Sequence, residues 1–117
     1  MCAVIPVAGS AAAAPGTFEA VPCSDVSVHV AGRVLSVDSV RELRAARCGY
    51  LTVPENRSRP TGRTIRLAVA IVPSVSQTPA PDPVVYLSGG PGVGTIGSAP
   101  GIIHSGFNRD RELVLMD

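Results

Sequence analysis

The sequence contains no lysine and no tryptophan, and it holds only two tyrosines and two phenylalanines. All ten of its cationic side chains are therefore arginines, and the formal net charge is only +1. Proteins that bind nucleic acid carry a basic stripe or a series of aromatic side chains on which bases stack, and this sequence has neither. We therefore expect no nucleic-acid partner.

Long apolar runs are also missing. A helix needs about 18 consecutive apolar residues to cross a bilayer, and no stretch of the chain is that long. The sequence thus predicts no membrane span. A chain of 117 residues is long enough for one small domain with its own core.

The most informative stretch covers residues 83–92, which read PVVYLSGGPG. Val84, Val85 and Tyr86 are typical of a buried strand, because β-branched and aromatic side chains suit a pleated surface. After Leu87 and Ser88, three glycines and a proline follow. Glycine N–H groups can approach an anion closely because no Cβ stands in the way. The stretch predicts a strand that leads into an anion-binding turn.

Two phosphate-binding motifs overlap this turn. A phosphate loop of the G-x-x-x-x-G-K type is excluded, because Thr95 stands where the lysine is required. Gly92, Gly94 and Gly97 match the dinucleotide pattern G-x-G-x-x-G, and Asp117 follows at the expected distance. That pattern should open a helix directly after the strand, whereas Pro100 interrupts the residues that follow it. A nucleotide-binding half-domain therefore remains an alternative.

Three segments together resemble a known family. Residues 88–92 (SGGPG) resemble the H-G-G-P-G segment of prolyl-aminopeptidase-like members of the α/β-hydrolase superfamily, with Ser88 in place of the usual histidine. Residues 47–57 (RCGYLTVPENR) are similar to the cysteine-containing first strand of secreted tripeptidyl-aminopeptidase-like hydrolases. Residues 109–117 (RDRELVLMD) are similar to the strand that, in those enzymes, runs into a Gln-Arg-Gly segment. The three matches occur in the family's order.

The resemblance implies an α/β fold, of which this chain is a truncated N-terminal portion covering residues 23–117. It implies an antiparallel opening hairpin followed by parallel strands. The residues agree with a hairpin of strands at 50–53 and 64–72, since both are apolar and a polar turn with Pro60 and Gly62 separates them. The apolar run 113–116 is expected beside 84–87 in a parallel sheet. The implied partner is the missing C-terminal half of the hydrolase.

The catalytic groups of such an enzyme are incomplete here. No serine lies in a Gly-x-Ser-x-Gly elbow, and Ser88, Ser98 and Ser105 have no evident base. By resemblance, the backbone N–H of Gly90 supplies half of an oxyanion hole, supported by Gly89, Pro91 and Gly92. The implied activity is hydrolysis of a peptide or ester by a serine that another segment provides. No cofactor or metal is implied, and the chain alone is expected to be inactive.

The first 22 residues are apolar and then rich in small side chains. They are typical of the second half of a secretory signal, although no positive charge precedes Arg33. A truncated signal and a disordered alanine-rich leader both fit this pattern. Cys2 lies in the leader, which leaves Cys23 and Cys48 as a candidate disulfide or as two buried free thiols. Secretion or attachment to the cell envelope is the expected location, and a small non-catalytic secreted module is a further alternative.

Shorter elements are expected elsewhere. Alternating valines predict a strand over 26–30, and residues 40–46 predict a short helix capped by Asp38 or Ser39. Residues 73–83 are expected to form an extended, proline-rich linker. One helical turn is expected at 102–104. His29 and His104 are interpreted as non-catalytic, because the hydrolase histidine comes last in the family's chain order.

Overall fold

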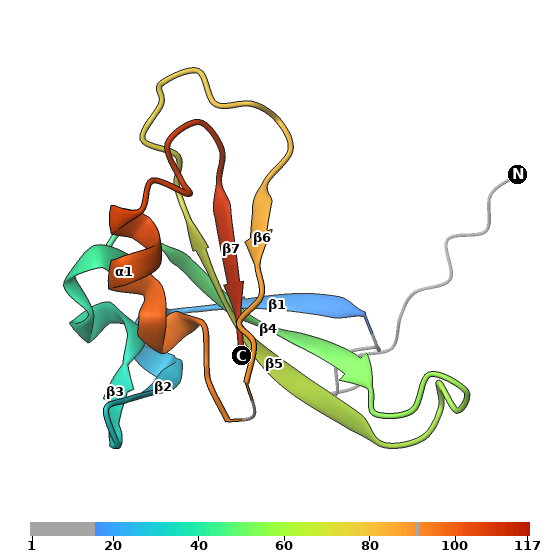
Figure 1. Cartoon of the computed structure of the whole chain (residues 1–117). Coiled ribbons are helices and arrows are strands. Elements are labelled where there is room, and N and C mark those ends of the chain that lie inside the picture. The colour runs from blue at the N-terminus through green and yellow to red at the C-terminus, as the bar shows by residue number, and fades with distance from the viewer. Residues whose placement is uncertain (1–15, 91) are drawn as a thin grey trace, which may run out of the picture.

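The computed structural model describes residues 16–90 and 92–117. Its centre is a five-stranded sheet in the order β1-β4-β5-β7-β6 (Figure 1). The strands are β1 (Thr17–Val21), β4 (Arg47–Pro54), β5 (Thr64–Val72), β6 (Val84–Tyr86) and β7 (Leu113–Met116). The hairpin expected at 50–53 and 64–72 is therefore confirmed, and its first strand begins earlier than expected.

Strand direction changes across this sheet. The pairs β1–β4, β4–β5 and β5–β7 are antiparallel, whereas β6 and β7 run parallel. The chain leaves β6, crosses over through residues 87–112, and returns as β7 between β5 and β6. The last ladder pair is Tyr86 with Leu115. Both parallel strands therefore end at the same edge, where the glycine turn begins.

A smaller layer covers one side of the sheet. It contains a two-stranded sheet of β2 (Ser27–Val30) and β3 (Arg33–Ser36), the 3₁₀ turns η1 (Cys23–Asp25), η2 (Val37–Ser39), η3 (Arg41–Leu43) and η4 (Ile96–Ser98), and the helix α1 (Ala99–His104). Figure 1 shows these elements gathered on the same side. The core between the layers consists mainly of aliphatic side chains: Val26, Val28, Val37, Leu43, Cys48, Ala70, Val72, Ile96, Ala99, Ile102, Leu113 and Leu115.

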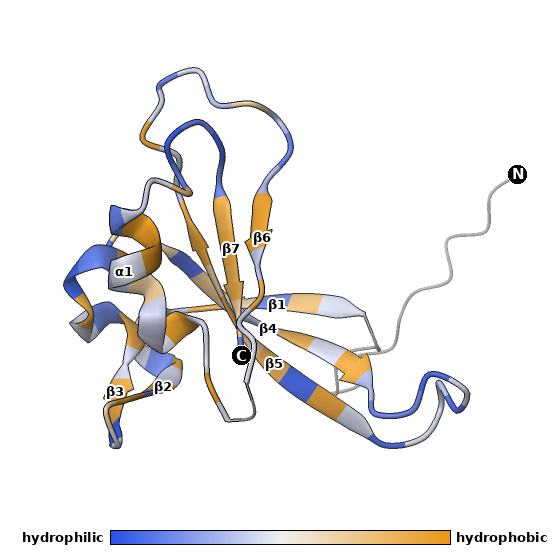
Figure 2. Ribbon diagram, in the orientation of Figure 1, coloured by the Kyte–Doolittle hydropathy of each residue, from blue (hydrophilic) through white to orange (hydrophobic). Residues whose placement is uncertain are grey.

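The opposite face of the sheet is apolar as well. Side chains alternate between faces along a strand, so Ile65, Leu67, Val69 and Ile71 of β5 point away from the core layer. Ile65 and Phe18 are each 42% exposed, and Val85 is 50% exposed. Figure 2 shows apolar residues along all the central strands. None of the described helical elements packs on this side, which we call the open face.

The expected α/β class is wrong. The described chain is mostly β, with a mainly antiparallel sheet and a single helix of 6 residues. The reason lies in the crossover between the parallel strands, where Gly94, Gly97, Pro100, Gly101 and Gly106 leave no room for a long helix. No described helix is long and apolar enough to cross a membrane.

The helix expected at 40–46 is also wrong. Successive i→i+3 hydrogen bonds join Val37, Val40, Leu43 and Ala46 instead, at N–O distances of 2.9–3.0 Å. Val37 and Leu43 are fully buried. Apolar side chains at every third position face the core only if the backbone has three residues per turn, which favours 3₁₀ over α geometry. Ser39 donates its hydroxyl to Ser36 O rather than capping a helix.

Two other expectations need adjustment. The strand at 26–30 is confirmed as β2, but the chain then turns at Ala31 and Gly32, both with positive φ, and pairs back as β3. Two residues with positive φ are typical of a type I′ hairpin. The strand at 84–86 exists, yet it lies at the sheet edge and is not buried as expected. Helix α1 includes the turn expected at 102–104.

Gly97 packs where the small sheet meets the crossover, and its replacement should be costly. A Cβ at this position would lie 2.5 Å from the carbonyl oxygen of His29, which belongs to rigid strand backbone. We expect Gly97→Ala to lower the free energy of unfolding by about 1–3 kcal/mol through overpacking. Chemical denaturation followed by circular dichroism measures this change.

Gly101→Ala is the matched control. Gly101 lies in α1, and a Cβ there would meet nothing within 4 Å. Alanine is the better helix former, so this variant should gain about 0.4–1 kcal/mol. Equal effects of the two substitutions would contradict the packing assigned to Gly97.

Candidate functional site

The glycine turn begins where β6 leaves the sheet. Leu87 is 75% exposed, so the apolar run ends in solvent rather than in the core. Gly90 and Gly92 have φ values of +92° and +78°. This left-handed region is costly for residues that carry a Cβ. Pro91, expected to support the turn, lies outside the described residues.

The backbone N–H of Gly90 is available to a ligand. Gly89 and Gly90 are both exposed, and neither amide donates a hydrogen bond to a described acceptor. An exposed amide in a left-handed glycine, at the end of a parallel strand, is suited to receive an oxyanion. The role expected of Gly90, with Gly89 and Gly92 beside it, stays a prediction.

No described serine is paired with a histidine. Ser98 and Ser105 donate their hydroxyls to the carbonyl oxygens of Gly94 and Gly101, at 3.3 and 2.9 Å. The side chain of His104 is 72% exposed, and its Nε2 lies 3.7 Å from Glu42 Oε1. Neither serine hydroxyl is therefore in contact with a base. The described residues also contain no group of three or more potential metal ligands.

Asp117 and Thr95 close the far end of the turn. The backbone amides of Thr95 and Ile96 both donate to Asp117 Oδ1, the second at 3.1 Å. The dinucleotide alternative assigned Asp117 to a ribose and left these amides for a pyrophosphate. In the structure a carboxylate occupies them, and its charge would repel a phosphate. This arrangement weighs against the nucleotide alternative.

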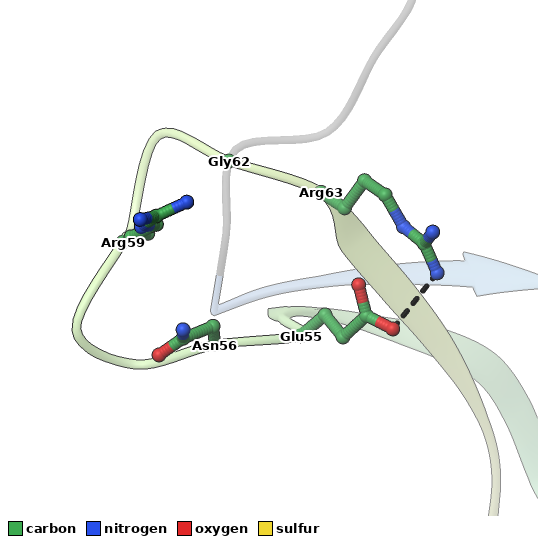
Figure 3. A pocket seen from close by; sticks show the side chains of 5 residues that line it. All are labelled: Glu55, Asn56, Arg59, Gly62 and Arg63. Carbon is green, nitrogen blue, oxygen red and sulfur yellow. Dashed lines mark hydrogen bonds and ion pairs between the residues drawn. The ribbon is translucent and has the colours of Figure 1, made fainter.

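A hollow of about 320 Å³ lies at the turn between β4 and β5. Its lining residues are Glu55, Asn56, Arg59, Gly62 and Arg63 (Figure 3). Arg63 pairs with Glu55 at 2.8 Å, although its side chain is 82% exposed. Asn56 Oδ1 accepts the amide of Ser58 at 2.9 Å, which is a local turn interaction. None of the lining residues belongs to the glycine turn.

The disulfide expected between Cys23 and Cys48 is present, with the two Cα atoms 5.1 Å apart. It joins η1 to β4 of the central sheet, where Cys48 lies opposite Val21 of β1 and Ala70 of β5. The enclosed segment contains the whole two-stranded sheet. The bond therefore ties the small layer to the large one.

No protein-family model, curated protein or solved structure matches the chain. Its function must therefore be argued from the glycine turn and its surroundings.

The roles of Thr95 and Asp117 at the turn were not expected from the sequence. Asp117 directly follows the apolar run of β7, and acidic residues at the carboxyl end of a parallel strand often serve a site at that edge. This position was the signal available for Asp117. Thr95 had none, because a threonine between glycines is typical of any loop.

Proposed function

We propose that this chain supplies the oxyanion-binding side of an exported serine hydrolase of the aminopeptidase-like type. The observation that carries the proposal is the exposed N–H of Gly90, held in left-handed geometry where β6 ends and without a described acceptor. The resemblance of residues 47–57, 88–92 and 109–117 to prolyl- and tripeptidyl-aminopeptidase-like enzymes indicates acyl transfer rather than phosphate binding.

The proposed chemistry requires a second segment. A serine there attacks the carbonyl carbon of a peptide or ester, and a histidine takes the serine proton. Negative charge then develops on the former carbonyl oxygen. The Gly90 N–H donates one hydrogen bond to that oxygen, and the residue after the serine donates the other. Each such donor is worth about 2.7–4 kcal/mol in the transition state.

Two surfaces of the chain support the requirement for a partner. The edge of β6 that faces away from β7 has unpaired backbone groups, which favour addition of another strand. The open face carries exposed Phe18, Ile65 and Val85, and apolar sheet faces are normally covered. A segment that supplies both a strand and a covering layer would bury these surfaces beside the glycine turn.

The disulfide supports the exported location. Disulfides persist in oxidising compartments and are rare where thiols are kept reduced. Cys48 is 3% exposed, so the bond is well shielded once formed. Of the expected leader 1–22, residues 17–21 instead form β1 and pair with β4, and residues 1–15 lie outside the described part of the chain.

Recovery of the chain under non-denaturing conditions from the cells that make it tests the proposal. We expect the recovered protein to include a segment with a Gly-x-Ser-x-Gly elbow and to hydrolyse tripeptidyl p-nitroanilides or aminoacyl esters. A fluorophosphonate should abolish this activity by labelling a serine outside residues 1–117. Labelling of Ser88, Ser98 or Ser105 would contradict the proposal, as would saturable binding of NAD that Gly94→Val removes.

Substitution of Gly90 tests its role within that enzyme. Alanine at φ +92° is strained and should shift the N–H, so we expect Gly90→Ala to lower kcat by about 100-fold or more. Gly32→Ala is the matched control, because Gly32 has φ +76° in the remote β2–β3 turn. It introduces similar strain without touching the site. Equal losses of kcat in the two variants would count against Gly90.

A further inference from the structure

A buried side chain connects the glycine turn to the end of β7. The Thr95 hydroxyl donates to the carbonyl oxygen of Met116 and accepts the amide of Met116 at 3.1 Å. Its oxygen also lies 3.0 Å from Asp117 Oδ1. Thr95 is only 2% exposed. We call Thr95, Met116 and Asp117 together the clasp.

The clasp ends the parallel ladder. Tyr86 and Leu115 form the last β6–β7 pair, so the next strand residue on β6 would normally pair with the Met116 backbone. Instead, the Thr95 hydroxyl binds both the N–H and the carbonyl oxygen of Met116. Residues 87–90 and 92–94 are thereby released from the sheet. The turn containing Gly90 is then fixed at one end by Tyr86 and at the other by Thr95.

The clasp also explains why residue 94 is a glycine. A Cβ at Gly94 would lie 2.8 Å from Asp117 Oδ2 and 3.1 Å from Oδ1. The carboxylate therefore packs directly against the turn backbone while it accepts the amides of Thr95 and Ile96. Substitution of Gly94 would push the carboxylate away from those amides.

We propose that Thr95 and Asp117 are positioning residues for the oxyanion-binding turn. They do not touch the substrate; they fix the end of the turn at Thr95 so that the Gly90 N–H keeps one orientation. This inference rests on the proposed function for its catalytic consequence. Its physical basis is that a donor fixed before the reaction loses little entropy when the oxyanion forms.

Backbone NMR relaxation of the Gly89 and Gly90 amides tests the proposal without any activity measurement. In the unmodified chain we expect order parameters near about 0.85, and in Thr95→Val values below about 0.6. Valine has the shape of threonine but lacks the hydroxyl. Thr95→Ser keeps the hydroxyl and should restore the rigid values. Ser105→Ala, which removes a hydroxyl bond to Gly101 O elsewhere in the crossover, should leave them unchanged.

Asp117→Asn provides a second variant should Thr95→Val fail to fold. Asparagine keeps an acceptor oxygen for the Thr95 and Ile96 amides but loses the charge, whereas Asp117→Ala loses both. We expect amide exchange at Thr95 and Ile96 to accelerate by about tenfold or more in Asp117→Ala, with smaller acceleration in Asp117→Asn. The order parameter of Gly90 should follow the same ranking. An unchanged Gly90 amide in all of these variants would overturn the proposal.

The recovered enzyme gives the second readout. Thr95→Val should lower kcat at least about tenfold with little change in KM, because the clasp acts on transition-state binding, and Thr95→Ser should restore kcat. A change in KM alone would overturn the positioning role. If the recovered protein hydrolyses nothing, the proposed function fails, while the relaxation data still decide whether the clasp orders the turn.

Discussion

Replacement of both Cys23 and Cys48 by alanine is expected to lower the free energy of unfolding by about 3.5 kcal/mol. The bond joins residues separated by 25 positions, and its loss returns that loop entropy to the unfolded chain. Small domains have a total stability of only about 5–15 kcal/mol. The loss is therefore a large share of the total stability.

The effect should be concentrated in the small layer. Residues between the two cysteines include Val26, Val28, Val37 and Leu43, all of which belong to the core. Without the bond, packing and the hydrogen bond from the Tyr50 hydroxyl to Asp25 O hold this segment against the sheet. Urea denaturation followed by circular dichroism measures the loss, and amide exchange locates it.

Both proteins in this comparison should carry Cys2→Ser, because the Cys2 thiol could otherwise exchange with the disulfide. In that background the double alanine variant should unfold at a clearly lower urea concentration. An unchanged urea midpoint would show that the small layer is held in place without the disulfide. Loss of a cooperative transition would count against the alternative of a small autonomous module, because a complete module should unfold cooperatively.

Leu115→Ala is expected to produce the second large effect. Leu115 is fully buried in β7, opposite Ala70 of β5 and Tyr86 of β6. Truncation of a buried leucine removes its transfer free energy and leaves a cavity, at a cost of about 2–5 kcal/mol. The neighbours here are strands on both sides, which limits their ability to collapse into the space.

Leu87→Ala makes the same chemical change at a position that is 75% exposed. We expect it to alter the free energy of unfolding of the isolated chain by less than about 0.5 kcal/mol. Denaturation midpoints of the two variants, measured side by side, provide the test. A similar loss in both would mean that residue 87 is packed in solution, contrary to the structure.

Several local features could be predicted from the sequence because they depend on nearby residues. Apolar strands separated by a polar turn indicated the β4–β5 hairpin, and three glycines after Tyr86 indicated the turn. The disulfide followed from the count of three cysteines once Cys2 was assigned to the leader. The 3₁₀ turns were not expected, although Val37, Val40 and Leu43 recur at every third position.

Other expectations failed because they were drawn from the family resemblance or from local composition alone. The α/β class implied helices on the sheet, yet the crossover contains the glycines and Pro100 that prevent a long helix. A run such as Val84, Val85 and Tyr86 has the same composition in a central strand and in an edge strand. Whether this run is buried or exposed could therefore be decided only from the order of the strands.

The sequence by itself indicated the strands β2, β4, β5, β6 and β7, where the glycine turn begins and which cysteines are available to pair; it did not indicate β1, which lies in the expected leader, or β3. These properties follow from local backbone preferences and side-chain chemistry. Only the tertiary structure decided that β7 enters between β5 and β6 and so brings Asp117 onto the amides of Thr95 and Ile96. Contacts across about 20 residues depend on how the whole sheet buries its apolar side chains, because no local preference specifies which strand becomes the neighbour of another.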